Sequence, residues 1–207
     1  MIGDVYKRQG NIGNDTIEGD AGDDQIFGGE GDDIISGGDG VDTITAGDGV
    51  DIIEGGDGAD TIYAGADNDT ITGGIGNDTI EGGDGLDTAI FAGNKDDFTF
   101  AVASDGTLTI TDTGTGNTLG VDTVSGVETL RFDDGDLTVN TTADGDVTLT
   151  GTDSDNDVIT LTGAGGATLD GVGGDDVLIG GDGADVCLLY TSDAADEGLG
   201  VDLGGRR

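Results

Sequence analysis

The stretch that decides the fold covers residues 28–63 and reads GGEGDDIIS GGDGVDTIT AGDGVDIIE GGDGADTIY. It contains four nonapeptides, each with glycine at positions 2 and 4, aspartate at position 6 and isoleucine at position 8. The same unit continues on both sides, so that residues 10–90 divide into nine consecutive nonapeptides. A short repeat of constant length is typical of solenoids, in which each unit packs mainly against its neighbours.

Two positions of the nonapeptide are almost invariant. Aspartate occupies position 6 in all nine units: Asp15, Asp24, Asp33, Asp42, Asp51, Asp60, Asp69, Asp78 and Asp87. Isoleucine occupies position 8 in every unit except the last, which has Ala89: Ile17, Ile26, Ile35, Ile44, Ile53, Ile62, Ile71 and Ile80. Agreement of this kind does not arise from a merely biased composition, so both positions carry a structural role.

The composition of each unit predicts a short strand followed by a turn. Positions 7–9, such as residues 43–45, are rich in β-branched residues, which favour a strand whose middle side chain points to one face. Positions 1–6 are rich in glycine, which permits the positive φ angles of tight turns. Two units make one coil of 18 residues. The sequence therefore predicts an all-β fold, a right-handed parallel β-roll of four and a half coils with the isoleucines inside.

The composition of the whole chain excludes several functions. The 207 residues include 45 acids, six bases, 45 glycines, one cysteine and no histidine, for a formal net charge of -39. Catalysis and zinc binding through histidine are excluded, and so is an internal disulfide. The charge would repel a phosphate backbone, so we expect no nucleic-acid partner. No apolar run is long enough for a membrane span or a cleaved signal peptide. The natural counter-species of such a polyanion is a hard cation.

The nonapeptides resemble the RTX, or hemolysin-type, calcium-binding repeat, whose pattern is G-G-x-G-x-D-x-U-x. In this family Ca²⁺ lies between two turns stacked on one side of the roll. The resemblance implies that the position-6 carboxylates of turns n and n+2 hold each ion, so that Asp15 faces Asp33 and Asp24 faces Asp42. Nine turns then allow at most about seven calcium ions in residues 10–90.

The resemblance also implies that backbone carbonyls at positions 1–4 complete each site. These ligands would be the carbonyl oxygens of Gly28, Gly29, Gly31, Gly37, Gly38, Gly40, Gly47, Gly49, Gly55, Gly56, Gly58, Gly73, Gly74 and Gly76. Ligation by oxygen alone suits Ca²⁺, which takes about six to eight oxygens and tolerates irregular geometry. The turn at residues 64–69 departs from the pattern, because Ala64 and Asp67 replace glycine there.

The charge of the repeat region makes calcium necessary for folding. Residues 10–90 contain 21 acids and no base, while the eight inward isoleucines form only a thin core. Self-repulsion opposes the compact state, and bound cations convert each pair of carboxylates into an attraction. We therefore expect the region to be disordered without cations and to fold when calcium binds.

Residues 91–150 lose the nonapeptide, and we expect them to form a β-rich segment that caps the roll. Alternating apolar residues predict strands near residues 98–102 and 108–110, with Asp105-Gly106 as a hairpin turn, and near 121–124, 127–132 and 147–149. Phe91, Phe98, Phe100 and Phe132 are interpreted as core of this cap, although a ligand-binding surface built on them is the alternative.

Residues 151–186 are interpreted as the start of a second RTX array. Three further nonapeptides can be framed over residues 162–188, with Asp176 and Asp185 at position 6 as further metal ligands and Ala167 at that position in the first unit. Residues 1–9 and 187–207 resemble translated sequencing adapter and are expected to be non-native ends. Four of the six basic residues and the single cysteine, Cys187, lie in these two ends.

Calcium chemistry leaves three functions open. The first is a calcium-binding module of a larger exported bacterial protein, which folds outside the cell, and for which the resemblance implies export by type I secretion machinery. The second is a calcium-stiffened spacer of a surface adhesin. The third is an accessory module of an extracellular protease, lipase or alginate epimerase. Adjacent acids such as Asp23-Asp24, Asp32-Asp33 and Asp175-Asp176 could suggest a glycosidase pair, but the repeat accounts for them, and we expect no enzymatic activity in this chain.

Overall fold

The computed structural model describes residues 7–188, apart from residues 104, 117, 143–145, 153–156, 163–165, 174–175 and 182–183. The chain divides into two compact units. The first consists of the described residues within Met1–Phe91 and Gly116–Thr129, and the second of those within Ala92–Thr115 and Leu130–Arg207. Most of both expected non-native ends, residues 1–6 and 189–207, lies outside the described residues.

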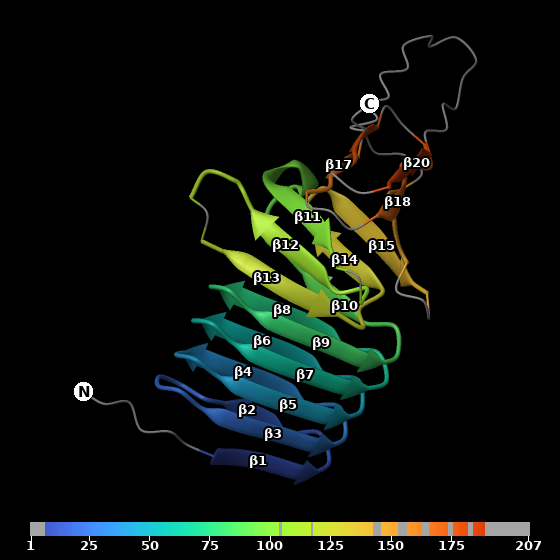
Figure 1. Ribbon diagram of the computed structural model, residues 1–207. Coiled ribbons are helices and arrows are strands. Elements are labelled where there is room, and N and C mark those ends of the chain that lie inside the picture. Colours follow the sequence, from blue (N-terminus) through green and yellow to red (C-terminus); the bar gives the residue numbers. More distant parts are fainter. Residues whose placement is uncertain are drawn as a thin grey trace. The chain divides into compact units, whose positions relative to one another are not determined.

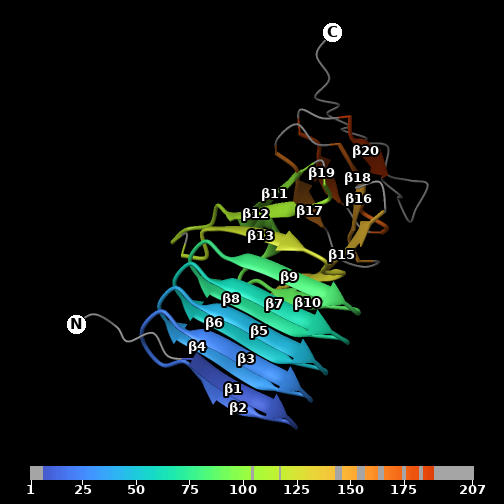
Figure 2. The ribbon, with the colours of Figure 1, turned by 60° about the horizontal axis from the view of Figure 1, so that its bottom comes forward.

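The first unit is a roll of two parallel sheets, which Figures 1 and 2 show as stacked strands. One sheet consists of β1 (Lys7–Ile12), β3 (Gln25–Glu30), β5 (Thr43–Asp48), β7 (Thr61–Ala66), β9 (Thr79–Asp84) and β13 (Val121–Ser125). The other consists of β2 (Thr16–Glu18), β4 (Ile34–Asp39), β6 (Ile52–Asp57), β8 (Thr70–Ile75) and β10 (Thr88–Ile90). Successive strands of the chain alternate between the two sheets, so the predicted parallel β-roll is confirmed.

The strands pair in the register that the repeat predicts, one coil of 18 residues apart. Ile44 lies opposite Ile26 and Ile62, and Gly47 lies opposite Gly29 and Gly65. Most strands are six residues long rather than the predicted three, because pairing skips position 1 and resumes at positions 2 and 3 of the next unit. The glycine at position 2 lacks a side chain that would separate the backbones, so pairing can resume there.

A tight turn at positions 4–6 separates one strand from the next. The position-4 residue has a positive φ in every turn of the nine units, for example 130° at Gly49. Glycine adopts this conformation without steric cost, which explains its recurrence at position 4. Asp67 is the exception in sequence but not in structure, since its φ of 79° preserves the turn.

The predicted isoleucine ladder is confirmed and forms the core of the roll. All eight position-8 isoleucines are buried, and Ala89 and Val124 continue the column. Their neighbours at position 7 face outward, as the alternating burial of the strands requires. Each coil therefore contributes two large inward side chains, one from each sheet, and the small residues at position 1, such as Ala46 and Ala64, add little volume, so the core is narrow.

The second unit begins with a short 3-10 helix, η1 (Lys95–Asp97), and an antiparallel hairpin of β11 (Phe98–Val102) and β12 (Leu108–Asp112). The predicted hairpin turn is confirmed, with Gly106 at a φ of 84°. Rings of Phe98 and Phe100 pack against Phe132 with centroids 5.1 and 6.1 Å apart. All three rings are buried, as is Phe91 in the first unit, so their interpretation as core is confirmed.

The remaining strands of the second unit belong to two of the sheets of the chain. One contains β14 (Thr129–Phe132), β15 (Gly135–Thr141), β16 (Val147–Thr150), β18 (Ala167–Asp170) and β20 (Val186–Leu188), and the other contains β17 (Val158–Thr160) and β19 (Val177–Ile179). Strands from β16 onward alternate between these sheets in parallel pairs, as in the roll. Residues 91–150, treated as one segment in the sequence, contribute to both units, because residues 116–129 add a coil to the roll.

The narrow core leads to a prediction about two adjacent isoleucines on β6. Ile53 is 1% exposed and Ile52 is 53% exposed. Ile53→Ala should lower the free energy of unfolding by about 2–4 kcal/mol, because it leaves a cavity between the sheets. Ile52→Ala, the matched control, should cost less than about 1 kcal/mol. Urea unfolding of both variants in excess calcium measures the difference, and equal losses would contradict the inward orientation of position 8.

Candidate metal centre

The position-6 aspartates form one continuous hydrogen-bonded column in each sheet of the roll. The backbone N–H of each aspartate donates to Oδ1 of the position-6 aspartate one coil further along the chain. For Asp51 the bond goes to Asp69 at 2.8 Å, and its own Oδ1 accepts the N–H of Asp33 at 2.8 Å. Each aspartate thus joins two coils, and its side chain is held inside the turn instead of pointing into water.

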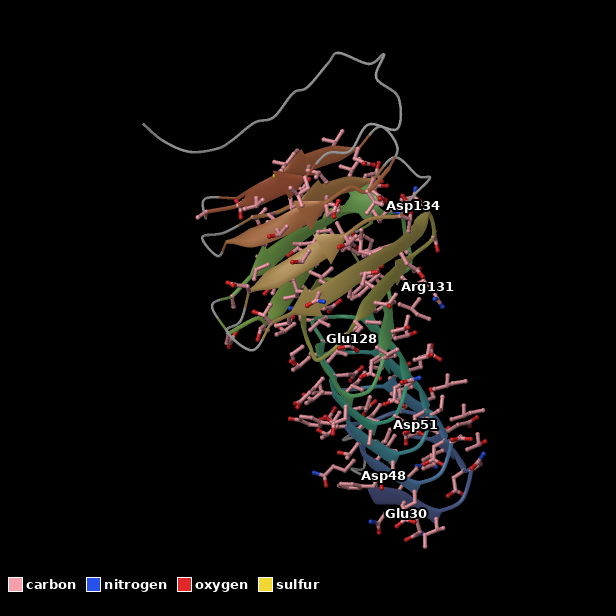
Figure 3. All side chains as sticks on the ribbon, turned by 90° about the vertical axis from the view of Figure 1, so that its right-hand side faces the viewer. Glu30, Asp48, Asp51, Glu128, Arg131 and Asp134 are labelled. Atoms are coloured by element: carbon pink, nitrogen blue, oxygen red, sulfur yellow. The ribbon has the colours of Figure 1, made fainter. Side chains whose placement is uncertain are left out.

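The structure brings together all seven pairs of aspartates that the sequence predicts. The bonds measure 2.7–2.8 Å and join Asp15 to Asp33, Asp24 to Asp42, Asp33 to Asp51, Asp42 to Asp60, Asp51 to Asp69, Asp60 to Asp78, and Asp69 to Asp87. From Asp24 onward these residues are at most 1% exposed. Figure 3 labels Asp51 on one of the coils.

The second carboxylate oxygen is buried and lacks compensation. Among the described residues, no hydrogen-bond partner is found for Oδ2 of Asp15, Asp33, Asp42, Asp51, Asp60, Asp69, Asp78 and Asp87. A buried carboxylate oxygen without a partner is costly, since it loses its water without gaining a replacement. The roll therefore contains a series of anionic oxygens that require a cation or a proton.

This burial changes the acidity of the aspartates. Loss of hydration raises the pKa of Asp51 and Asp60 to about 6 and that of Asp69 to about 7. The hydrogen bond from the preceding coil opposes the rise in pKa, and repulsion from neighbouring acids adds to it. Burial raises the pKa of Asp42, Asp78 and Asp87 in the same direction. The uncompensated carboxylates are thus unstable as anions without a counter-charge.

Backbone carbonyls lie beside these carboxylate oxygens. A β-carbon built on Gly55 would lie 2.6 Å from Oδ2 of Asp60 and would also contact the carbonyl oxygen of Gly73 on the next coil of the same sheet. The same pairing of carboxylate and carbonyl oxygens recurs at Gly28 and Gly37. At positions 2 and 4, each glycine faces the carbonyl of its equivalent one coil earlier, as Gly47 faces Gly29 and Gly49 faces Gly31. Oxygen atoms of both kinds therefore line the turns.

The turn that departs from the pattern keeps this arrangement. Ala64 is buried at position 1, and Asp67 reproduces the left-handed backbone of the glycine it replaces. Aspartate enters that region more readily than most residues. Asp69, in the same turn, still accepts from Asp51 and donates to Asp87. The column of carboxylates consequently passes through residues 64–69 without interruption.

Two acids that the sequence analysis did not include extend the columns beyond the ninth unit. Oδ1 of Asp122 accepts the N–H of Asp78 at 2.8 Å, and Oε2 of Glu128 accepts the N–H of Asp87 at 2.9 Å. The phrase Gly-Val-Asp-Thr at residues 120–123 repeats residues 40–43, and this signal could have identified Asp122. Asp122 was missed because it follows Asp78 by 44 residues, whereas paired aspartates in the repeats are 18 residues apart.

The same geometry recurs in the second array. Oδ1 of Asp176 accepts the N–H of Asp157 at 3.0 Å, and Oδ1 of Asp185 accepts the N–H of Ala167 at 3.1 Å. Asp157 is fully buried and takes position 6 before β17, although the predicted frame did not reach it. Its separation of 19 residues from Asp176 breaks the strict period.

The acids next to position 6 have a different role. Oδ1 of Asp32 accepts the N–H of Val50 at 3.0 Å, and Oδ1 of Asp23 accepts that of Val41 at 3.0 Å. These position-5 side chains are exposed and form an outer ladder parallel to the buried one. The interpretation of Asp23-Asp24 and Asp32-Asp33 as repeat positions is confirmed, while Asp175 lies outside the described residues.

The donor set fits a hard cation. Among the described residues no three acidic, cysteine or histidine side chains come together as a metal cluster, so main-chain carbonyls or water would have to complete any coordination. Carboxylate and carbonyl oxygens are the ligands that Ca²⁺ prefers, and they suit zinc or copper poorly. The buried oxygens without partners meet this requirement along both sheets of the roll.

Comparison with known proteins agrees with this chemistry. The RTX calcium-binding nonapeptide repeat family matches in overlapping segments at residues 9–44, 29–62, 36–71, 45–80, 54–89 and 63–98, and again at residues 161–189. No curated protein matches the chain. The family's repeats bind Ca²⁺ between turns of the β-roll, and the matched segments cover more than half of the 207 residues. The chain therefore belongs to the RTX calcium-binding nonapeptide repeat family.

Proposed function

We propose that the roll is a folding module controlled by calcium, which is disordered where calcium is scarce and folds where calcium is abundant. The observation that carries this proposal is the set of buried Oδ2 atoms without hydrogen-bond partners among the described residues. No basic residue lies in residues 10–90 to neutralise them. A bound metal ion would supply the missing charge, and its binding energy would then contribute directly to folding.

The ligands of each ion would come from two neighbouring coils of one sheet. Position-6 carboxylates of both turns would provide charged oxygens, and carbonyls of the glycine-rich positions 1, 2 and 4 would complete the shell. Asp122 and Glu128 would extend the two series by one turn each. Asp176 and Asp185 would serve in the second array, where their backbone bonds follow the same pattern.

The biological setting that fits this chemistry is export of a larger bacterial protein. Calcium is scarce in the cytosol and abundant outside, so the chain would stay unfolded before export and fold afterwards at the cell surface or in the medium. Type I secretion machinery would be its partner in this setting. In the described part of the chain, no helix combines the length and apolar character that a membrane crossing requires.

Two matched variants test whether particular oxygens or merely the total charge bind the metal. Asp51→Asn keeps an oxygen to accept the N–H of Asp33 but removes the charge and the uncompensated oxygen. Asp48→Asn removes one charge from an exposed site at the end of β5, in the same nonapeptide as Asp51 (Figure 3). Because Asp51 would serve two ions, Asp51→Asn should raise the calcium midpoint of folding about twofold or more. Asp48→Asn should leave the midpoint unchanged or lower it.

The measurement is a calcium titration of both variants and the parent chain, followed by circular dichroism. The parent chain should change cooperatively from a disordered spectrum to a β-rich one as calcium is added. Equal midpoints for the two variants would contradict the assigned sites, and a β-rich spectrum in excess chelator at neutral pH would contradict the coupling itself.

The raised pKa values predict an unusual pH dependence without calcium. The pKa of an unfolded aspartate is 3.8, and the folded values for Asp51, Asp60 and Asp69 are about 6 to 7. The folded chain therefore binds more protons between these limits, and its free energy of unfolding falls as pH rises from about 4 to about 7. In calcium-free buffer the β signal in circular dichroism should be stronger at about pH 4.5, where the folded aspartates hold their protons, than at about pH 8, where they have lost them.

A pair of variants in one turn isolates the cause of this pH dependence. Asp69→Asn removes a buried titrating group and should flatten the decline in stability between about pH 4 and 7. Asp67→Asn removes an exposed acid whose repulsion is the smallest cause raising the pKa of Asp69, and it keeps a residue that tolerates positive φ. It should therefore change the slope far less than Asp69→Asn does. Calcium-free stability that increases with pH in this range would show that burial does not control these carboxyls.

A further inference from the structure

Lys95 is the one buried base among the residues that the structure describes in the second unit. It lies in η1, is 1% exposed, and is one of only two bases in residues 10–186. The other base, Arg131, is half exposed and forms an ion pair with Asp136 at 3.1 Å. A buried ammonium is costly unless anionic or carbonyl oxygens surround it, so its partners indicate its role.

Those partners are two acids of the same unit. Nζ of Lys95 lies 3.0 Å from Oδ1 of Asp157 and 3.7 Å from Oδ1 of Asp134. It also donates a hydrogen bond of 3.0 Å to the carbonyl oxygen of Asp134. The backbone N–H of Lys95 donates to Oδ1 of Asp134 at 2.9 Å, which fixes η1 on this acid (labelled in Figure 3). Asp157 is 0% exposed, so the pair with Lys95 is closed to water.

Asp157 resembles the roll aspartates in how its two oxygens are used. One oxygen, Oδ2, accepts the backbone N–H of Thr152 at 2.8 Å. The other, Oδ1, is buried and has no hydrogen bond with the described residues, so the ion pair with Lys95 compensates its charge. In the roll, the corresponding oxygens of Asp51 and Asp60 have no basic residue beside them. At Asp157 the ammonium group of Lys95 therefore supplies the positive charge that a metal ion would supply in the roll.

We propose that Lys95 is an internal cation that replaces calcium at Asp157 and lets the first coil of the second array form without metal. The N–H of Asp157 donates to Asp176, and β17 pairs with β19, so a coil held by Lys95 would present a template for the next one. The second unit would then retain folded structure where the roll does not. Calcium binding in the roll serves here only as a comparison. Protection of β17 in the second unit is measured without calcium, so its loss would leave the proposed function of the roll unaffected.

Hydrogen exchange of the full chain, read by peptide, tests this proposal in calcium-free buffer at pH 7.5. Amides of β17 in the parent chain should exchange at least a hundredfold more slowly than amides of β5. Lys95→Met should remove this protection by about a hundredfold or more, because it leaves Asp157 as a buried unpaired charge. Arg131→Met, which also removes one positive charge from the second unit, should leave β17 unchanged.

A double variant separates the charge from the packing of Lys95. Asp157→Asn keeps an acceptor for the N–H of Thr152 but removes the negative charge. Amides of β17 should therefore exchange at least tenfold more slowly in the double variant Lys95→Met with Asp157→Asn than in Lys95→Met alone. Three outcomes would overturn the proposal. These are β17 exchanging as fast as β5 in the calcium-free parent chain, β17 protection unaffected by Lys95→Met, and a double variant no better protected than Lys95→Met alone.

Discussion

The roll depends on one interaction, the hydrogen bond from the backbone N–H of each position-6 aspartate to the carboxylate one coil further on. This bond fixes the 18-residue register, because it joins equivalent residues such as Asp33 and Asp51. It also places the carboxylates in a column inside the turns, where the second oxygen of most of them is buried and has no hydrogen-bond partner among the described residues. The interaction that aligns the coils therefore also buries the negative charge of the aspartates inside the turns.

The two units compensate buried charge in different ways. Residues 10–90 hold no base, and the narrow isoleucine core cannot balance a column of buried anions, so an external cation or protonation has to do so. In the second unit Lys95 provides a fixed positive charge at Asp157. An external ion makes folding depend on the surroundings, whereas a lysine makes it independent of them. The chain thus combines a calcium-binding roll that has no base in residues 10–90 with a second unit that has its own counter-charge at Asp157.

The period of the sequence was sufficient to predict the parallel roll, the inward column from Ile17 to Ile80 and the pairing of position-6 aspartates. These features repeat every nine residues, and backbone geometry then dictates where they lie. Residues outside the period were missed for the same reason. Asp122 follows Asp78 by 44 residues, and Lys95 contacts Asp157 across 62 positions, so only the folded chain brings these residues together. The strands exceeded their predicted length because pairing resumes at the glycine of position 2 and continues to position 3.

The central claim is that folding of the roll and occupation of its buried carboxylates are one event. Native mass spectrometry with ion mobility tests it directly, because it counts bound calcium and measures compactness in the same molecules. At neutral pH and rising calcium, the account predicts an extended population with almost no ions and a compact population with several, and few molecules between them. A compact roll without calcium, or extended chains that carry a full set of ions, would contradict it.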